Sequence, residues 1–335
     1  MSTASASLRR PGRLSPRRLL DAMQSLGLLA VLVVVFIGVS IAEPRFFSSD
    51  SIKAILINSS MLAVCGFGMT LAIALRGIDL SVGSVQALAA VVAAKLSSTG
   101  TPLALAIAAA LLAGVIAGAL NGVVISQLRV PAFVATLGMM SIARGVALIY
   151  SNGGSFLVSD SSFTDISRDS IAGVPLPFVI TLLALLAAWT LFNHTPFGRH
   201  IAAAGGNEDA AVASGIRLAP LVIIVFAIVG LTAAMAGVLL TAQVAYIDGT
   251  VGVGFELNVI AVVVLGGTSL AGGRGNLLGT LLAAILIASI TGALNILGVA
   301  TLYQYLAVGL LLILALALQS LRDRLAGRSS ADGGE

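Results

Sequence analysis

IKAILINSSMLAVCGFGMTLAIALRGIDLSVGSVQALAAVVAAKL, residues 52–96, is the stretch that decides the fold. It contains two apolar runs, 52–75 and 82–96, and the first is longer than the roughly 20 residues that a helix needs to cross a bilayer. Both runs are apolar all round, which is typical of helices among lipid and other helices. Between them the chain has charged residues, two glycines and two serines, in Arg76-Gly77-Ile78-Asp79-Leu80-Ser81-Val82-Gly83-Ser84. A plain turn would need fewer special residues, so we expect two membrane helices joined by a structured break.

The composition of the whole chain indicates the same class. Of its 335 residues 58% are hydrophobic and 10% are charged, whereas a soluble domain carries about 25% charged residues. The formal net charge is +4, but the basic residues are scattered singly and form no dense patch, so we expect no nucleic-acid partner. The single cysteine, Cys65, lies inside an apolar run, where neither an intrachain disulfide nor a cysteine-based metal site is expected.

We therefore expect an all-α integral membrane fold with about ten transmembrane helices. The apolar segments lie at 26–42, 52–75, 82–96, 103–126, 131–150, 178–192, 221–243, 257–270, 276–297 and 302–319. Residues 1–25 then form a basic N-terminal tail, residues 26–320 the transmembrane domain and residues 321–335 a C-terminal tail. The first segment also resembles a signal peptide, because arginines precede it and Ser40-Ile41-Ala42 is a passable cleavage site. We favour a retained helix, since it gives the later segments a consistent orientation.

The distribution of basic residues predicts that orientation. With the N-terminus inside, thirteen of the eighteen Lys and Arg residues fall on the inner side, as the positive-inside rule requires. These are Arg9, Arg10, Arg13, Arg17, Arg18, Arg76, Arg129, Arg199, Arg217, Arg274, Arg322, Arg324 and Arg328. All four tyrosines fall at outer ends, where interfacial aromatic residues gather. Both termini are therefore expected in the cytoplasm.

Two loops are long enough to do more than connect helices. Residues 151–177 form an outer loop, and residues 193–220 form an inner loop. Within the inner loop, residues 202–214 favour a helix that ends at Gly215. This helix faces whatever partner lies in the cytoplasm.

An internal repeat is also visible. Gly118-Ala119-Leu120-Asn121 recurs as Gly292-Ala293-Leu294-Asn295, near the ends of the fourth and ninth segments. Segments five apart run in opposite directions, so we predict an inverted repeat, although a chance match in an Ala-rich chain is the alternative. The third and eighth segments are both short and flanked by glycines, a pattern that indicates a transporter's pathway.

Motifs for catalysis and for cofactors are missing from the sequence. No G-x-x-x-x-G-K-[S/T] occurs, so this chain cannot hold nucleotide phosphates in a P-loop. His194 and His200 have no Cys or acidic residue at ligand spacing, and no Ser-His-Asp pattern is present. We expect no catalytic residue, no metal and no cofactor in this chain.

Polar side chains in apolar segments are the candidates for a translocation pathway, because an unsatisfied polar group in a bilayer costs several kcal/mol. They are Asn58, Asp79, Ser81, Ser84, Asn121, Arg144, Asn258 and Asn295. For each Asn an interhelical hydrogen bond is the alternative explanation. For Arg144 we leave open local pairing near the outer interface and a place in the wall of a cavity.

At this point the chain resembles the permease subunits of bacterial ABC importers for monosaccharides, of the ribose and xylose permease type. The resemblance covers most of residues 50–320. It is carried by Gly77-Ile78-Asp79-Leu80-Ser81-Val82-Gly83-Ser84, Asn121-Gly122 to Pro131-Ala132-Phe133, Thr136-Leu137-Gly138, Ala143-Arg144-Gly145, the inner loop from Gly198-Arg199 to Ser214-Gly215-Ile216, Leu265-Gly266-Gly267-Thr268 and Gly272-Gly273-Arg274-Gly275. The first of these is typical of the sugar branch, and the last is similar to the wider superfamily, which includes nucleoside and branched-chain amino-acid permeases.

The resemblance implies an inner helix that docks into an ATPase. In such importers this helix has the pattern Glu-Ala-Ala, three residues, Gly, and here Asp209-Ala210-Ala211 with Gly215 resembles it, with Asp in place of Glu. Asn207, which precedes this match, is expected to take part in the coupling to the ATPase together with these residues. The longer spacing to a following Ile-x-Leu-Pro is absent, since Ile216 comes at once.

The resemblance also implies the function and the partners. They are import of a sugar such as ribose or xylose in the bacterial inner membrane, a second copy of the permease, a cytoplasmic ATPase with two nucleotide-binding domains, and a periplasmic or lipid-anchored sugar-binding protein. Membrane lipid surrounds the assembly. An ion-coupled secondary transporter and a membrane-embedded enzyme are the rival interpretations.

Overall fold

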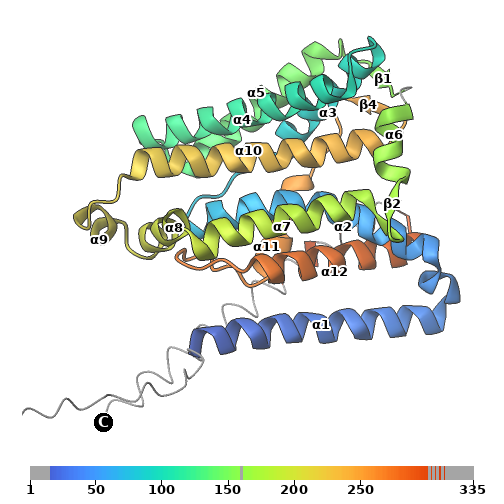
Figure 1. The fold of residues 1–335 in the computed structure, drawn as a ribbon, viewed down its shortest axis with the longest axis horizontal. Helices are drawn as coiled ribbons and strands as arrows, with labels where there is room; N and C mark the ends of the chain where they lie inside the picture. Colours follow the sequence, from blue (N-terminus) through green and yellow to red (C-terminus); the bar gives the residue numbers. More distant parts are fainter. Residues whose placement is uncertain are drawn as a thin grey trace, which may run out of the picture.

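The structure is a computed structural model that describes residues 16–158 and 161–300, together with positions 303, 306, 309, 310 and 313. The described part is a bundle of helices with two very short two-stranded sheets (Figure 1). Its elements are α1 (Pro16–Ala42), η1 (Pro44–Phe47), α2 (Ser49–Ala74), α3 (Val82–Ser98), α4 (Leu103–Gln127), α5 (Ala132–Tyr150), β1 (Ser155–Leu157), α6 (Ser161–Arg168), β2 (Ser170–Ile171), β3 (Val174–Pro175), α7 (Leu176–His194), α8 (Pro196–Gly206), α9 (Glu208–Ala213), α10 (Leu218–Gln243), β4 (Tyr246–Asp248), α11 (Phe255–Leu265) and α12 (Leu277–Ile296).

Six helices of the described part are long and apolar enough to cross a membrane, namely α2, α4, α5, α7, α10 and α12. Shorter apolar helical stretches cover 27–42 of α1, α3 and α11. The predicted all-α membrane fold is therefore confirmed at this level. Most of the segment expected at 302–319 lies outside the described residues, and so do the C-terminal tail and the arginines before residue 16. The count of ten therefore stays a prediction.

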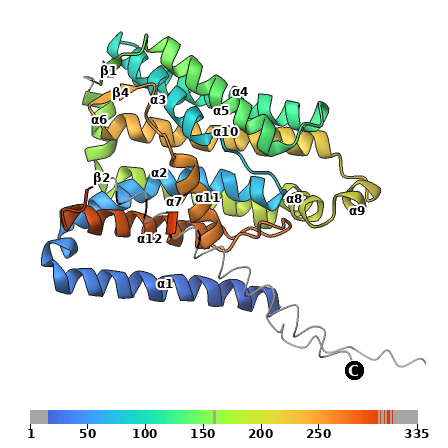
Figure 2. The ribbon, with the colours of Figure 1, turned by 180° about the vertical axis from the view of Figure 1, so that it is seen from behind.

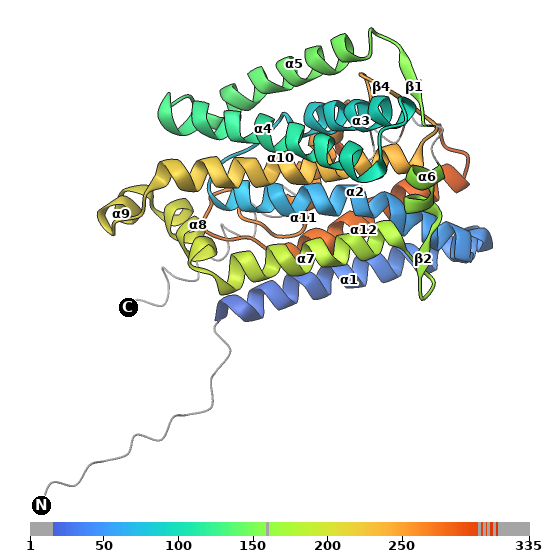
Figure 3. The ribbon, with the colours of Figure 1, turned by 45° about the horizontal axis from the view of Figure 1, so that its top comes forward.

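The helices lie roughly side by side, with α10 and α2 in the middle. Along one direction α4 and α5 lie on one side of this pair, and α12 followed by α1 lies on the other (Figures 1 and 3). The short helices α8 and α9 lie at the same end of the bundle as the first residues of α1. The sheet of β1 and β4 and the helix α6 lie at the opposite end (Figure 2). The loops predicted as inner and outer thus lie at opposite ends. We call the end with α8 and α9 the inner end and the opposite end the outer end, after the predicted orientation.

The packing of α4 on α10 depends on small residues. Gly114, Gly118 and Gly122 of α4 face α10, and a methyl group added at Gly122 would lie 2.5 Å from the Cα of Ile223. A methyl group at Gly118 would overlap the carbonyl group of Phe226. Glycines at this G-x-x-x-G spacing therefore allow α10 to approach α4 closely.

The expected break lies between α2 and α3. Helix α2 ends at Ala74, and Arg76 follows with a φ of 64°, in the left-handed region. The N–H of Gly77 donates to the carbonyl oxygen of Ala72 at 2.8 Å, which closes the helix end. Helix α3 then starts at Val82, and its first turn is buried. The two short helices expected beside glycine-rich segments are α3 with 17 residues and α11 with 11 residues.

The inner loop differs from the prediction. We expected one helix over residues 202–214, but the chain forms α8 and α9, which meet at Asn207. The backbone of Asn207 is extended, and its Oδ1 accepts a hydrogen bond from the N–H of Ala210 at 3.0 Å. Asn207 thus caps a new helix, directly after two glycines that are poor helix formers. The inner loop therefore carries a helix–cap–helix unit.

Candidate functional site

Three of the predicted pathway residues form one buried cluster at the break. The backbone N–H and the hydroxyl of Ser81 both donate to Oδ1 of Asp79, at 2.7 and 2.6 Å. The amide Nδ2 of Asn121, on α4, donates to Oδ2 of Asp79 at 3.3 Å and to Oγ of Ser81 at 3.1 Å. Each of the three side chains is about 1% exposed, and Ser84 is buried beside them in the first turn of α3. In the part of the chain that the structure describes, no cation forms an ion pair with Asp79.

Neighbouring helices hold the break in place on both sides of this cluster. The hydroxyl of Thr136, on α5, donates to the carbonyl oxygen of Ile78 at 3.2 Å. Gly77 lies against Phe226 of α10, where an added methyl group would lie 2.9 Å from its ring. The break is therefore a rigid junction of α3, α4, α5 and α10.

A second turn of the same kind lies at the outer end of the bundle. Ile247-Asp248-Gly249-Thr250-Val251-Gly252 repeats the pattern of Ile78-Asp79-Leu80-Ser81-Val82-Gly83. The backbone N–H and the hydroxyl of Thr250 both donate to Oδ1 of Asp248, at 2.6 and 2.5 Å. These two hydrogen bonds hold the pKa of the Asp248 carboxyl below its ordinary value, since they favour its charged form. Sequence reasoning missed this turn, although the shared Ile-Asp-x-[Ser/Thr]-Val-Gly pattern was visible.

The two turns are linked at their glycines. A methyl group added at Gly252 would lie 2.6 Å from the carbonyl oxygen of Gly83 and 2.7 Å from Oε1 of Gln86. Oε1 of Gln86 is buried and has no hydrogen-bond partner. Each motif also begins four residues after the end of a 26-residue helix, α2 in one case and α10 in the other.

Arg144 holds the outer turn from α5. Its Nη1 donates to the carbonyl oxygens of Gly249 and Val251, at 2.7 and 2.6 Å. The guanidinium is partly buried, and it lines neither of the two cavities described below. We left open whether Arg144 pairs locally near the outer interface or lines a cavity. Its hydrogen bonds to Gly249 and Val251 favour local pairing.

Two of the other predicted asparagines, Asn58 and Asn295, lie near the outer end. Oδ1 of Asn58, on α2, accepts a hydrogen bond from Nε2 of Gln243, on α10, at 3.0 Å. Asn58 and Asn295 line the same cavity of about 420 Å³. Its wall is formed by Arg45, Ser48, Ser51, Ala54, Ile55, Asn58, Gly292, Asn295 and Ile296. Asn258, in the first turn of α11, is half-buried and is not part of this wall.

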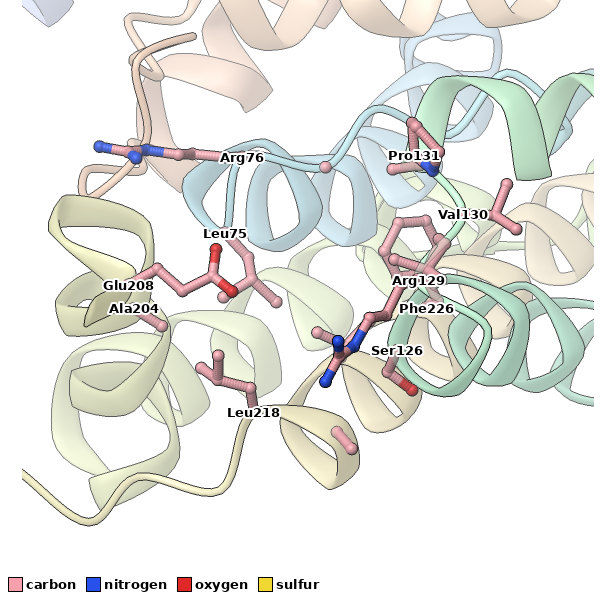
Figure 4. Close-up of a pocket in the computed structure, with 15 residues that line it drawn as sticks. Leu75, Arg76, Ser126, Arg129, Val130, Pro131, Ala204, Glu208, Leu218 and Phe226 are labelled. Atoms are coloured by element: carbon pink, nitrogen blue, oxygen red, sulfur yellow. The ribbon is translucent and has the colours of Figure 1, made fainter. Parts of the chain in front are cut away.

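A larger cavity of about 620 Å³ opens at the inner end, beside α8 and α9 (Figure 4). The side chains of Arg129 and Glu208 extend into it from opposite walls. Arg76 contributes to the wall with its backbone, while its guanidinium points away from the cavity. This cavity therefore separates the α4–α5 connection from the α8–α9 unit.

The residues expected to dock an ATPase lie on α9 and at its two ends, but they do not share one face. Asp209 and Ala210 are exposed, whereas Ala211 is 3% exposed and packs inward. Val212 is 52% exposed, an unusual position for an aliphatic side chain at a polar end of the molecule. Gly215 ends the unit with a φ of 84°. The surface open to a partner is thus formed by Glu208, Asp209, Ala210 and Val212.

Comparison with known proteins identifies relatives of most of the chain. A family model described as "Branched-chain amino acid transport system / permease component" matches residues 51–316. The ribose import permease protein RbsC of Escherichia coli (strain K12) is 41% identical over 297 residues, 88% of this chain and 92% of that protein. The ribose import permease protein RbsC of Bacillus subtilis (strain 168) is 40% identical over 298 residues, with the same two coverages. The D-allose transport system permease protein AlsC of Escherichia coli (strain K12) is 36% identical over 295 residues, 88% of this chain and 90% of that protein. No solved structure matches significantly.

The buried cluster generates a prediction about stability. Asn121→Leu keeps the side-chain volume but removes the donor that satisfies Oδ2 of Asp79. Leaving a buried acceptor unsatisfied costs about 1–3 kcal/mol, and more for a charged group. We expect the thermal unfolding midpoint of the purified protein in detergent to fall by several degrees. Asn193→Leu is the matched control, because Asn193 is exposed and bonds only within its own helix. Equal midpoints for the two variants would contradict the role of Asn121.

Proposed function

Because this chain belongs to the family of permease components of branched-chain amino acid transport systems, we propose that it is the transmembrane subunit of an ATP-driven importer of a monosaccharide. It is a multi-pass inner-membrane permease, as its apolar helices and its relatives show. The observation that carries the sugar assignment is that the curated relatives described above are named for monosaccharides and match nearly their whole length. Among monosaccharides we propose ribose as the first candidate substrate, since two of those relatives are ribose import permeases.

The polar groups that line the outer cavity favour a sugar over an amino acid as the substrate. Its polar wall consists of two hydroxyls and two carboxamides, together with the exposed Arg45. Uncharged donors and acceptors of this kind suit the hydroxyls of a sugar. An amino-acid zwitterion would also need an anionic partner for its ammonium group, and this wall has no Asp or Glu. The name of the matched family keeps branched-chain amino acids as the second candidate, with nucleosides after them.

The proposal assigns the chemistry of ATP to other subunits. The chain has no phosphate-binding loop, so ATP hydrolysis belongs to a cytoplasmic ATPase with two nucleotide-binding domains. A periplasmic or lipid-anchored binding protein delivers the sugar, and a second copy of this permease completes the pathway. The solute-binding partner meets the outer end with β1, β4 and α6, and the ATPase meets α8 and α9.

We further propose ten helices related by an inverted repeat. The equal lengths of α2 and α10, the similar turns after them and the contact of Gly83 with Gly252 support this symmetry. So does the packing, because α10 lies against α4 in the way that α2 lies against α12. Residues 1–25 and 321–335 are then cytoplasmic tails around a transmembrane domain of 26–320.

The proposed pathway runs from the outer cavity to the buried turn at Asp79. Asn58 and Asn295 offer hydrogen bonds at the outer mouth, with Asn258 deeper on α11. Asp79, Ser81, Ser84 and Asn121 form the closed inner end in this state, and Arg144 fixes the outer turn. The hydrogen bonds of the closed end are satisfied within the chain, so opening it requires α3 and α4 to move apart.

A transport assay tests the proposed function directly. The permease is purified with its ATPase subunit, reconstituted into proteoliposomes and supplied with ATP inside and sugar-loaded binding protein outside. We expect uptake of labelled D-ribose that requires both ATP and the binding protein, and no competition by L-leucine. Uptake that persists without ATP would instead indicate a secondary transporter, and uptake of leucine would favour the amino-acid branch.

The outer mouth can be tested in the same assay. Asn58→Leu and Asn295→Leu remove hydrogen-bonding groups from the cavity wall. We expect the rate of sugar uptake to fall severalfold in each variant, because the sugar loses partners that replace its hydration. Asn193→Leu, at the inner end of α7, should transport at the wild-type rate. Normal uptake by both cavity variants would make Asn58 and Asn295 packing residues.

The docking surface predicts a separate effect on assembly. Val212→Glu places a charge on the exposed face of α9, and a hydrophobic contact with a partner would be lost. We expect less ATPase subunit to co-purify with this variant while the permease stays inserted. Leu157→Glu is the control, since Leu157 is similarly exposed but lies on β1 at the outer end. Co-purification at the wild-type ratio for Val212→Glu would place the docking surface elsewhere.

A further inference from the structure

Three segments far apart in the sequence meet at the inner end of the bundle. They are the end of α2 with Ala74 and Arg76, the end of α8 with Gly205 and Gly206, and the loop 269–275 between α11 and α12. We call this meeting point the inner junction. It lies beside the large inner cavity, on the side toward which Arg76 points (Figure 4).

Arg76 connects all three segments with one side chain. Its Nε donates to the carbonyl oxygen of Ala271 at 2.9 Å, and its Nη2 donates to the carbonyl oxygen of Gly206 at 2.8 Å. The planar guanidinium suits two acceptors at a fixed separation, which the single ammonium group of a lysine does not. Arg76 also holds a φ of 64°, a conformation that residues with a side chain rarely adopt.

The backbones at the inner junction are closely packed. The N–H of Gly273 donates to the carbonyl oxygen of Ala74 at 2.8 Å. A methyl group added at Gly205 would overlap that same carbonyl oxygen, and one added at Gly272 would lie 2.5 Å from Cγ of Arg76. A displacement of the end of α8 must therefore displace the end of α2 as well, because closely packed backbones do not deform independently.

Arg76 lies only three residues before Asp79. The residues between them are fixed by the contact of Gly77 with Phe226 and by the hydrogen bond from Thr136 to Ile78. The segment 76–81 is thus attached to α8 at one end and to Asn121 at the other. This short segment therefore connects the α8–α9 unit directly to the buried polar cluster.

From this geometry we propose that Arg76 is the positioning residue that transmits movement of the α8–α9 unit to the Asp79–Ser81–Asn121 cluster. The inference rests on the proposed function, in which α8 and α9 contact the ATPase. It adds the route by which closure of the ATPase domains opens or seals the inner end. Arg76 contacts neither the ATPase nor the sugar in this role.

The test separates transport from ATP hydrolysis. In proteoliposomes with the ATPase and the binding protein, Arg76→Ala should leave assembly and ATP hydrolysis near the wild-type level. Sugar uptake per ATP hydrolysed should fall by at least about fivefold, the lower end of typical coupling effects. Arg76→Lys keeps the charge but cannot reach both carbonyl oxygens together, so its coupling should be intermediate. Water can replace both hydrogen bonds because Arg76 is exposed, so we expect the alanine variant to fold.

Arg129→Ala is the matched control. Arg129 also has a left-handed φ, 56°, and lines the same cavity, but within the described residues it makes no hydrogen bond or ion pair. Wild-type uptake per ATP in Arg76→Ala, or an equal loss in Arg129→Ala, would overturn the proposal. If the alanine variant is unstable in detergent, Arg76→Gln is compared with Arg129→Gln by the same ratio and the same criteria. Failure of the wild-type protein to take up sugar with ATP would refute the proposed function instead.

Discussion

The carboxylate of Asp79 must be satisfied inside an apolar bundle, and much of the architecture follows from that constraint. A charged or polar group without partners in such a place costs several kcal/mol. The chain meets this cost locally with the Ser81 turn and at long range with Asn121 of α4. Asn121 can reach Asp79 only because the glycines of α4 allow it to lie close to α10, which in turn contacts the break at Gly77. A single buried carboxylate thus fixes how α3, α4 and α10 meet.

A turn with the same hydrogen bonds from a hydroxyl and a backbone N–H to an aspartate occurs again at the outer end. The Asp248 turn has the same two internal hydrogen bonds as the Asp79 turn, but it is more exposed and its neighbour is a guanidinium. Arg144 binds the backbone carbonyls of this turn and leaves its carboxylate to the Thr250 hydroxyl and amide. The Asp79 turn is thus hydrogen-bonded by the carboxamide of Asn121, and the Asp248 turn by the guanidinium of Arg144 from α5.

The inner end combines a rigid junction with an open space. The backbone contacts around Ala74 and Gly205 allow no relative movement, whereas the neighbouring cavity gives the α8–α9 unit room to shift toward the α4–α5 connection. This arrangement is what the proposed coupling through Arg76 requires. Val212 is exposed on α9, whereas Ala211 of the same helix packs inward.

The sequence by itself determined the class of the protein, the positions of the apolar helices that the structure describes and the break at 76–84. These depend on hydropathy, helix length and the polar and glycine residues of the break, all of which are local properties of the chain. The close approach made by Gly114, Gly118 and Gly122 was also predictable, since side chains four apart share a helix face.

Only the tertiary structure decided which polar residues meet. It paired Asn121 with Asp79, directed Arg144 to backbone carbonyls and divided the inner helix at Asn207, so that Ala211 points inward. It also brought Arg76 to Gly206 and Ala271, residues separated from it by more than a hundred positions. Such contacts depend on how helices cross and not on any local pattern, because hydrogen bonds in a bilayer form with whatever donor or acceptor the packing brings within reach.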